Sequence, residues 1–440
     1  MSDSAKKLSA QQRLSSLFDD GVFYELDAVS GREDGAIAGY GSVGGASVYA
    51  FCQDSSVDNG VLDKRAIRKL EKAYDMAAKT GCPVVTIYDS LGVNVSDAFG
   101  SLENASLLTG KIAQLSGVVP QISVVVGNCG GFYALAATMS DICVMSADAN
   151  LYLTSAFNDN SEVSGVGSAE YAAKAGAAAV VCEDEASAIA KAADIVKLLP
   201  LNNLAPLPVF DFEAPAASGV SFESIADVDT VVELFAGVAE NVNTVLATIG
   251  GTPCGILDIN GEICSKGSAK AAKLVQLCDS FNLPVVVLMD CTGFVNSAAN
   301  DVAGGIVNAA KLAHVMASAT TAKITVIKGS AVGSAFAVLA GKGAGADVTL
   351  AVASASVSAL NARASVDILW RDRITTPADI DKLAKEFCAT NASASAAAEA
   401  GLVDVVVADS DVRGSIITAI DMLASKRVST LSKKHGNMPF

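Results

Sequence analysis

Two glycine-rich segments, one in each half of the sequence, have the residue types needed to hold a negative charge. Residues 124–133 read Val-Val-Val-Gly-Asn-Cys-Gly-Gly-Phe-Tyr, and residues 326–336 read Val-Ile-Lys-Gly-Ser-Ala-Val-Gly-Ser-Ala-Phe. In each, a β-branched run typical of a buried strand leads through a glycine-rich turn into an alanine-rich stretch typical of a helix. The first N–H groups of a helix have no acceptor within the helix, so they can bind an anion. We therefore expect two oxyanion sites in this chain.

The backbone N–H groups at these turns are the candidate catalytic groups. They belong to Gly131 and Phe132 in the first segment and to Ser334 and Ala335 in the second. Preorganised N–H donors stabilise the negative charge that develops on a carbonyl oxygen, and glycine lets the backbone approach closely. The alternative is that the glycines only permit a helix to pack closely on a strand. Because the turn occurs twice, in a chain poor in histidine, the catalytic interpretation is favoured.

Other kinds of site are less consistent with the sequence. Neither turn is followed by Lys-Ser or Lys-Thr, so a P-loop is absent, and Gly-x-x-x-Gly spacing alone is weak evidence for a nucleotide site. The two histidines, His314 and His435, argue against a Ser-His-Asp triad and against a histidine-ligated metal, so we expect no metal.

Composition narrows the class of protein further. A net charge of −16 argues against a nucleic-acid partner. With 51% hydrophobic residues and no apolar run of transmembrane length, the chain is expected to have large cores and buried subunit interfaces. Its start is polar and lacks the apolar core of a signal peptide, and its ten cysteines include no Cys-x-x-Cys pair. Reduced thiols in a cytoplasmic protein are predicted.

The elements that must position the turns occur twice. A predicted buried strand at residues 83–89 returns at 284–290, at an offset of 201, and Gly127 returns as Gly329, at an offset of 202. Predicted helices at 102–116 and 304–320 lie between these landmarks. The proline-rich residues 200–219 form the best candidate linker. We therefore predict an internal duplication that gives two α/β domains, at residues 1–205 and 206–440.

Three local predictions concern the surroundings of the turns. Two short strands that flank Gly44-Gly45 form a hairpin. Residues 62–79 form a charged amphipathic helix, whose Lys64, Arg65, Arg68 and Lys69 could meet phosphates but more simply form a solvated face. Asp89 and Asp290 end predicted strands and are expected to cap the following turns rather than to catalyse.

Ordered motifs along nearly the whole chain resemble one family. Residues 117–129, followed by Ser140-Asp141, are similar to the first-domain signature of the biotin-dependent acyl-CoA carboxyltransferases. Residues 290–294, Asp-Cys-Thr-Gly-Phe, stand where the family has Asp-x-Pro-Gly-Phe, and the closing residues 434–439 also match. The family comprises subunits of acyl-CoA carboxylases and of sodium-pumping acyl-CoA decarboxylases.

The resemblance implies a fold, a reaction and roles for the turns. It implies two tandem crotonase-like domains and transfer of CO2 between biotin and the α-carbon of a short acyl-CoA. The N–H groups of Gly131 and Phe132 would hold the thioester enolate, and those of Ser334 and Ala335 the biotin ureido oxygen. The substrate-binding positions it implies are Gly130, Gly333 and Ala337.

The resemblance also implies partners. The chain lacks the Met-Lys-Met of biotin attachment, so biotin would arrive on a separate biotin carboxyl carrier protein. It lacks an ATP-grasp region, so a biotin carboxylase, or the membrane subunits of a decarboxylase, would complete the complex. The subunits would pair the first domain of one copy with the second domain of another, in a hexamer.

Departures from the family pattern leave a second hypothesis open. The first turn has Gly130-Gly131-Phe132-Tyr133 where the family prefers Ala-Gly-Gly-Ala. The second has Gly333-Ser334 where Gly-Gly is usual. The alternative is a catalytically impaired, carboxyltransferase-like scaffold or binding subunit of a carboxylase or decarboxylase complex.

Overall fold

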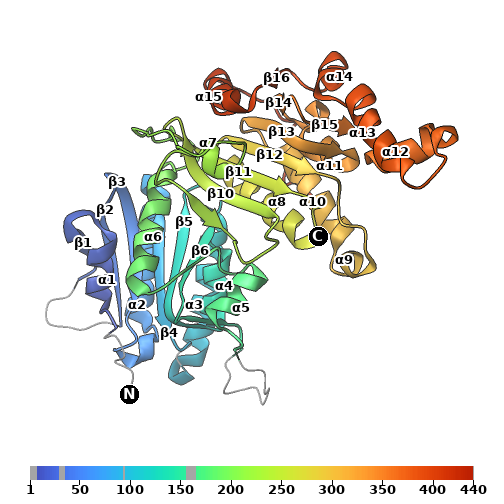
Figure 1. Cartoon of the computed structure of the whole chain (residues 1–440). Helices are drawn as coiled ribbons and strands as arrows, with labels where there is room; N and C mark the ends of the chain where they lie inside the picture. The colour runs from blue at the N-terminus through green and yellow to red at the C-terminus, as the bar shows by residue number, and fades with distance from the viewer. Residues whose placement is uncertain (1–6, 29–34, 93–94, 155–164, 440) are drawn as a thin grey trace. The chain divides into compact units, whose positions relative to one another are not determined.

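The computed structural model describes residues 7–28, 35–92, 95–154 and 165–439 (Figure 1). The chain separates into two compact units, Met1–Pro208 and Val209–Phe440. The junction lies in the proline-rich stretch, after Pro208 rather than after residue 205. Each unit is a mostly parallel sheet with helices packed on it, which confirms the predicted α/β class with two similar domains. The polar start, residues 1–6, lies outside the described residues.

The first unit is built on an eight-stranded sheet in the order β1-β2-β3-β4-β5-β6-β8, with β7 paired to the end of β5. The first three strands are antiparallel and all later pairings are parallel. All seven residues of β4 are buried, as expected for a strand covered on both faces. The strands are β1 (Phe23–Leu26), β2 (Ala36–Val43), β3 (Ala46–Gln53), β4 (Val84–Ser90), β5 (Gln121–Gly130), β6 (Ile142–Ser146), β7 (Asn150–Tyr152) and β8 (Val180–Cys182).

Helices form two layers on this sheet. One layer contains α1 and α6, and the other contains α2, α3 and α4. The predicted charged helix is α2; Asp63 caps its start and Gly81, in the left-handed conformation, ends it. The helices are α1 (Ala10–Leu17), α2 (Lys64–Thr80), α3 (Ala98–Leu115), α4 (Phe132–Met139), α5 (Ala169–Ala175) and α6 (Glu185–Leu198).

The second unit repeats the sheet, in the order β9-β10-β11-β12-β13-β14-β16, with β15 paired to the end of β13. Its strands are β9 (Val232–Leu234), β10 (Val242–Ile249), β11 (Thr252–Asn260), β12 (Val285–Cys291), β13 (Lys323–Val332), β14 (Val348–Val352), β15 (Ser356–Ser358) and β16 (Val405–Val407). Its helices are α7 (Phe222–Ile225), α8 (Ser265–Ser280), α9 (Ala298–Val302), α10 (Gly305–Ser318), α11 (Gly333–Leu339), α12 (Ala362–Leu369), α13 (Asp379–Asn391), α14 (Ala394–Glu399) and α15 (Val412–Leu423).

The duplication extends to individual hydrogen bonds at the hairpins. In the first unit the N–H groups of Gly44 and Gly45 donate to the carboxylate of Asp19, at 2.9 and 3.0 Å. In the second unit the two glycines between β10 and β11 donate in the same way to Asp227, at 3.0 and 2.8 Å. All four glycines have positive φ, which a two-residue turn matched to strand twist requires. The predicted hairpin at Gly44-Gly45 is confirmed.

The strands that lead to the two turns share a second pair of contacts. The hydroxyl of Ser123 on β5 donates to the carbonyl of Ala137 at 2.7 Å. The hydroxyl of Thr325 on β13 donates to the carbonyl of Leu339 at 2.5 Å. Both residues of the second pair lie 202 positions after those of the first. Each unit therefore fixes its short helix, α4 or α11, to the strand before it by the same bond.

Strand β5 is longer than the sequence predicts. The glycine-rich turn predicted after the β-branched run would end the strand near Gly127, but β5 continues to Gly130, because β7 pairs with its last three residues. Gly130 lies opposite Tyr152 in this ladder, and a Cβ at Gly130 would lie 2.6 Å from the Tyr152 ring. Glycine at this position is thus explained by packing against Tyr152. Of the helices in the described ranges, none combines the length and apolarity needed to cross a bilayer.

Candidate active site

Each glycine turn begins where the central parallel strands change register. The pairing of β4 with β5 shifts between Tyr88 and Ser90, and that of β12 with β13 shifts between Met289 and Cys291. The residues inside these shifts are the two aspartates that the sequence analysis singled out. A bulge of this kind re-aims the chain at the end of a strand.

Asp89 and Asp290 pack directly against the first glycine of each turn. A Cβ at Gly127 would lie 2.0 Å from Oδ1 of Asp89, and one at Gly329 would lie 2.4 Å from the Asp290 carboxylate. Asp290 also accepts the N–H of Ser330 at 2.7 Å. Glycine is therefore needed at both positions because a carboxylate occupies the place of a side chain.

We expect Gly127→Ala to lower the free energy of unfolding of the first unit by about 1–3 kcal/mol, because the added methyl group overpacks a buried site. The measurement is a urea unfolding curve. The matched control is Gly110→Ala in α3, where an added Cβ meets nothing within 4 Å. That change is expected to raise stability by up to ~1 kcal/mol, because alanine favours a helix. Equal shifts for the two variants would contradict the packing role of Gly127.

The first turn leads into α4 through a glycine in an unusual conformation. Gly131 has φ 61° and ψ −123°, and its N–H donates to the carbonyl of Tyr152 at 2.8 Å. The predicted donor pair therefore changes, because the N–H of Gly131 already has an acceptor. The N–H groups of Phe132 and Tyr133 have no acceptor within the part of the chain that the structure describes. They are the donors that the first turn presents.

The second turn reaches α11 in the same way. Gly333 has φ 57°, and the N–H groups of Ser334 and Ala335 find no acceptor among the described residues. The positive φ falls on glycine in both copies, so Phe132 and Ser334 adopt ordinary helical geometry. Phenylalanine in the first turn is thus compatible with the backbone conformation that presents its N–H.

The side chain of Phe132 lines a hollow with residues of α2 and α3. It is half-buried and packs on the core of the first unit, with its ring centroid 5.3 Å from that of Tyr133. The two rings line a mainly apolar hollow together with Leu62, Ile67 and Leu108. The first helix start therefore has an apolar hollow beside it.

The surroundings of the second helix start are more open. Ser334 and Ala337 are exposed, whereas Ala335 is buried. Gly333 and Phe336 border a hollow whose other walls come from β15, α12 and α13. Ala337 instead borders a separate hollow near Lys342. The predicted residues Gly333, Ser334 and Ala335 thus lie together, while Ala337 faces different neighbours.

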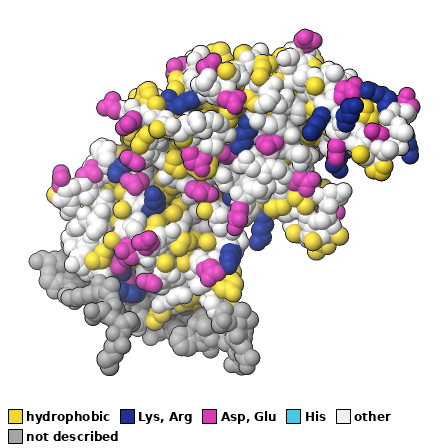
Figure 2. Space-filling view, in the orientation of Figure 1, with side chains coloured by type: hydrophobic (Ala, Val, Ile, Leu, Met, Phe, Trp, Pro, Cys, Tyr) yellow, Lys and Arg dark blue, Asp and Glu magenta, His cyan; other side chains and the backbone are white. Residues whose placement is uncertain are grey.

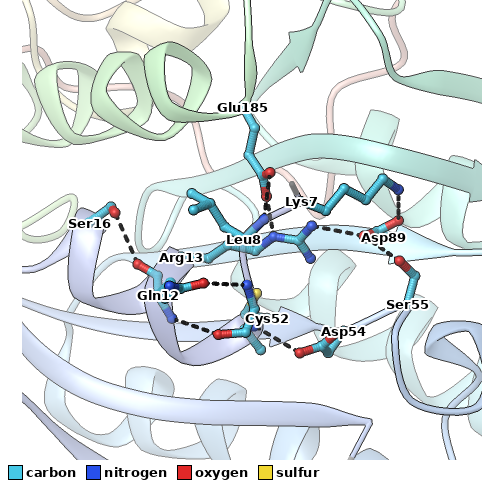
Figure 3. Close-up of polar contacts among 12 residues, drawn as sticks. Lys7, Leu8, Gln12, Arg13, Ser16, Cys52, Asp54, Ser55, Asp89 and Glu185 are labelled. Carbon is cyan, nitrogen blue, oxygen red and sulfur yellow. Dashed lines mark hydrogen bonds and ion pairs between the residues drawn. The ribbon is translucent and has the colours of Figure 1, made fainter. Parts of the chain in front are cut away.

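The sequence analysis did not identify one buried cation, Arg13. It pairs with Asp89, the carboxylate that packs against Gly127 of the first turn (Figure 3). The Arg13 side chain is 1% exposed. Its Nη2 donates to Asp89 at 2.8 Å, its Nη1 to the carbonyl of Gln53 at 2.8 Å, and its Nε to Glu185. Burial opposes the charge of Arg13, but nearby Cys52, Glu185 and Asp89 outweigh burial and raise its pKa. Arg13 thereby joins α1, β3, β4 and α6.

The basic face expected of α2 is only partly solvated: Lys64 and Arg68 are exposed, whereas Lys69 is buried. Lys69 is 1% exposed and its Nζ pairs with Glu25 at 3.0 Å, so it is neither on a solvated face nor open to a phosphate. Its counterpart at an offset of 201, Lys270 in the second unit, donates to the carbonyls of Phe235 and Val238. Lys69 thus joins α2 to strand β1, and Lys270 joins α8 to the loop after β9.

Charged side chains of both signs are interspersed over the face in Figure 2, with basic ones most concentrated over α12 and α13. Two of the arginines there are paired, Arg363 with Asp381 and Arg373 with Glu386. Across the described ranges, no group of three or more His, Cys, Asp or Glu side chains is arranged to hold a metal ion.

The fold and the site together define a two-domain α/β subunit with a matching glycine turn and helix start in each domain. Comparison with known proteins identifies the class. Residues 3–438 match the family described as the carboxyl transferase domain, and the chain belongs to that family. The predicted carboxyltransferase subunit is thereby confirmed.

Relatives cover nearly the whole chain. The propionyl-CoA carboxylase beta chain of Saccharopolyspora erythraea is 30% identical over 98% of this chain and 90% of its own length. The methylmalonyl-CoA decarboxylase subunit alpha of Propionigenium modestum is 29% identical over 98% and 93%. The crystal structure of transcarboxylase 12S, with methylmalonyl-coenzyme A and methylmalonic acid bound, has a TM-score of 0.91 and 27% identity over 99% of this chain and 93% of that one.

Proposed function

We propose that this subunit moves CO2 between biotin on a separate carrier protein and the α-carbon of a short acyl-CoA. The observation that carries the proposal is the pair of matching helix starts, at Phe132 and at Ser334, whose N–H groups have no acceptor in the described residues. Two substrates each place a developing negative charge on an oxygen, and the chain provides one set of donors for each.

The first unit holds the thioester. The N–H groups of Phe132 and Tyr133 bind its oxygen and stabilise the enolate that forms when the α-proton leaves. This pair replaces the predicted pair of Gly131 and Phe132, because the N–H of Gly131 is bonded to Tyr152. The role of Gly131 is to turn the chain so that α4 begins at Phe132.

The second unit has N–H donors and an adjoining hollow that suit biotin, whose polar ureido group is part of an otherwise apolar ring system. Bound biotin supplies the CO2 carrier and a ureido oxygen that becomes anionic. The N–H groups of Ser334 and Ala335 hold that oxygen, and the hollow beside Gly333 and Phe336 receives the apolar rings. The exposed position of Ser334 leaves the donors open to a group delivered by another protein.

We propose the assembly on the basis of the relatives. Their names describe beta chains and alpha subunits of larger complexes, and the transcarboxylase 12S title describes a hexamer. A homohexamer that works with a biotin carboxyl carrier protein and with a biotin carboxylase or membrane decarboxylase subunits fits this chain. A cytoplasmic location fits its ten unbridged cysteines.

The second candidate function is a binding or scaffold subunit that has lost catalysis. The observation that favours it is the ring of Phe132, which takes space beside the first helix start. The unbonded N–H of Phe132 favours the active subunit, because this donor belongs to the backbone and does not depend on the side chain.

The purified protein is expected to decarboxylate at least one of malonyl-, methylmalonyl- and glutaconyl-CoA in the presence of free biotin. The measurement is loss of the carboxylated thioester with and without biotin. Absence of turnover with all three, combined with turnover by Phe132→Gly, would show that the ring blocks the site and that the scaffold function holds.

A further inference from the structure

The hollow beside Phe132 is small and is lined mainly by apolar side chains. Its apolar wall comes from Leu62, Ile67 and Leu70 of the α2 region and from Leu108 of α3. The centre of a water molecule can reach about 20 Å³ of it. A volume of roughly 10–15 Å³ by this measure holds one water molecule, so the free space accepts about one methyl group.

The hollow is a feature of the first copy of the duplicated fold. The positions 201 after Ile67 and Leu70 are Ser268 and Ala271, on α8 of the second unit. With these small residues, α8 and α10 pack directly against one another. The apolar wall of the hollow therefore results from the larger side chains of α2 rather than from the fold itself.

The two parts of Phe132 connect this hollow to the reaction. Its N–H is one of the donors proposed for the thioester oxygen, and its ring lies in the hollow. The position 202 later is Ser334, which has no ring. A group attached to the thioester carbonyl is thus close to the space that the ring occupies.

We propose that the apolar hollow receives the alkyl end of the acyl group and that the ring of Phe132 sets the longest chain it admits. This proposal rests on the proposed function and adds its substrate class, acyl-CoA with little more than a methyl branch at the α-carbon. Removing the ring opens apolar space next to the reacting carbon and leaves the N–H donor in place.

Each methylene group moved from water into an apolar site contributes roughly a fourfold gain in binding. Opening the hollow to two further methylene groups should therefore change the preference between substrates by about tenfold or more. The change should be graded, because leucine removes part of the ring volume and alanine removes all of it.

The test uses full-length protein and a series of α-substituted substrates, malonyl-, methylmalonyl-, ethylmalonyl- and butylmalonyl-CoA, decarboxylated with free biotin. The measured quantity is kcat/KM for each, expressed relative to malonyl-CoA. The relative value for butylmalonyl-CoA is expected to rise about tenfold in Phe132→Ala and by a smaller factor in Phe132→Leu. The control is Leu135→Ala, on the exposed face of the same helix, which should leave the preference unchanged.

Dissociation constants of acetyl-, butyryl- and hexanoyl-CoA, measured calorimetrically for the same variants, separate this proposal from the proposed function. Tighter hexanoyl-CoA binding in Phe132→Ala supports the hollow as the acyl site even where no variant turns over. Unchanged ratios in both binding and turnover overturn the proposal, even where all variants are active carboxyltransferases.

Discussion

Ser334→Pro is expected to lower the biotin-dependent decarboxylation rate by about 100- to 1000-fold, the usual effect of losing one oxyanion donor. Proline has no N–H, and its fixed φ suits the first turn of a helix, where Ser334 stands. The preceding residue is Gly333, which tolerates the restrictions that a following proline imposes. The substitution therefore removes the donor and leaves α11 able to form.

The matched control is Ser334→Ala, which removes the hydroxyl and keeps the N–H. It should retain activity within a few-fold, because the Ser334 hydroxyl makes no hydrogen bond to the described residues. The readout is the rate with saturating methylmalonyl-CoA and free biotin, together with the thermal midpoint. Similar losses in both variants would assign the effect to the hydroxyl, and unchanged rates in both would remove Ser334 from the mechanism.

Arg13→Met is expected to destabilise the first unit by about 3–5 kcal/mol, because it removes the buried cation shared by Asp89 and Glu185. Asp89 then keeps only the exposed Lys7, whose Nζ lies 3.3 Å from its carboxylate. The corresponding fall in the thermal midpoint is on the order of 10 °C for a unit of this size. Arg13→Lys should recover part of the loss. A lysine supplies the charge but cannot replace the planar fork that reaches three acceptors.

The control for this prediction is Lys72→Ala in the same unit. Lys72 pairs with Asp27, but the side chains are 44% and 45% exposed, and an exposed pair contributes about 0–1 kcal/mol. Differential scanning calorimetry of the three variants checks the prediction. A shift for Arg13→Met no larger than that for Lys72→Ala would contradict the role of the buried cluster.

Much of the fold was predictable because its sequence pattern occurs twice in the chain. The strands before the turns, the hairpin at Gly44-Gly45 and the helices between them follow local patterns of apolar residues and glycine. The shared offset of 201 to 202 then links the two copies. The helix start at Phe132 was predictable for the same reason, since a β-branched run, a glycine turn and an alanine-rich stretch are all local signals.

What the sequence missed depends on partners that are distant along the chain. The N–H of Gly131 is occupied because β7 returns to extend β5 as far as Gly130, and no pattern near the turn indicates that pairing. Arg13 was not singled out, and Lys69 was assigned to a solvated face, although each lies on the apolar stripe of its helix, beside Leu14 and Leu70. A charged residue on a buried stripe is the signal that could have revealed both.

The Arg13 cluster also has a consequence for biosynthesis on the ribosome. Glu185 lies 172 positions after Arg13. Synthesis proceeds at about 5–20 residues per second, so Glu185 is made on the order of ten seconds after Arg13. In the second unit the order is reversed, because Lys328 follows its acceptor Asp258 by 70 positions and finds it already present. In the nascent chain, helix α1 is therefore the first helix of its layer to be made, but it gains its ion pair with α6 only after that last helix of the first unit has been made.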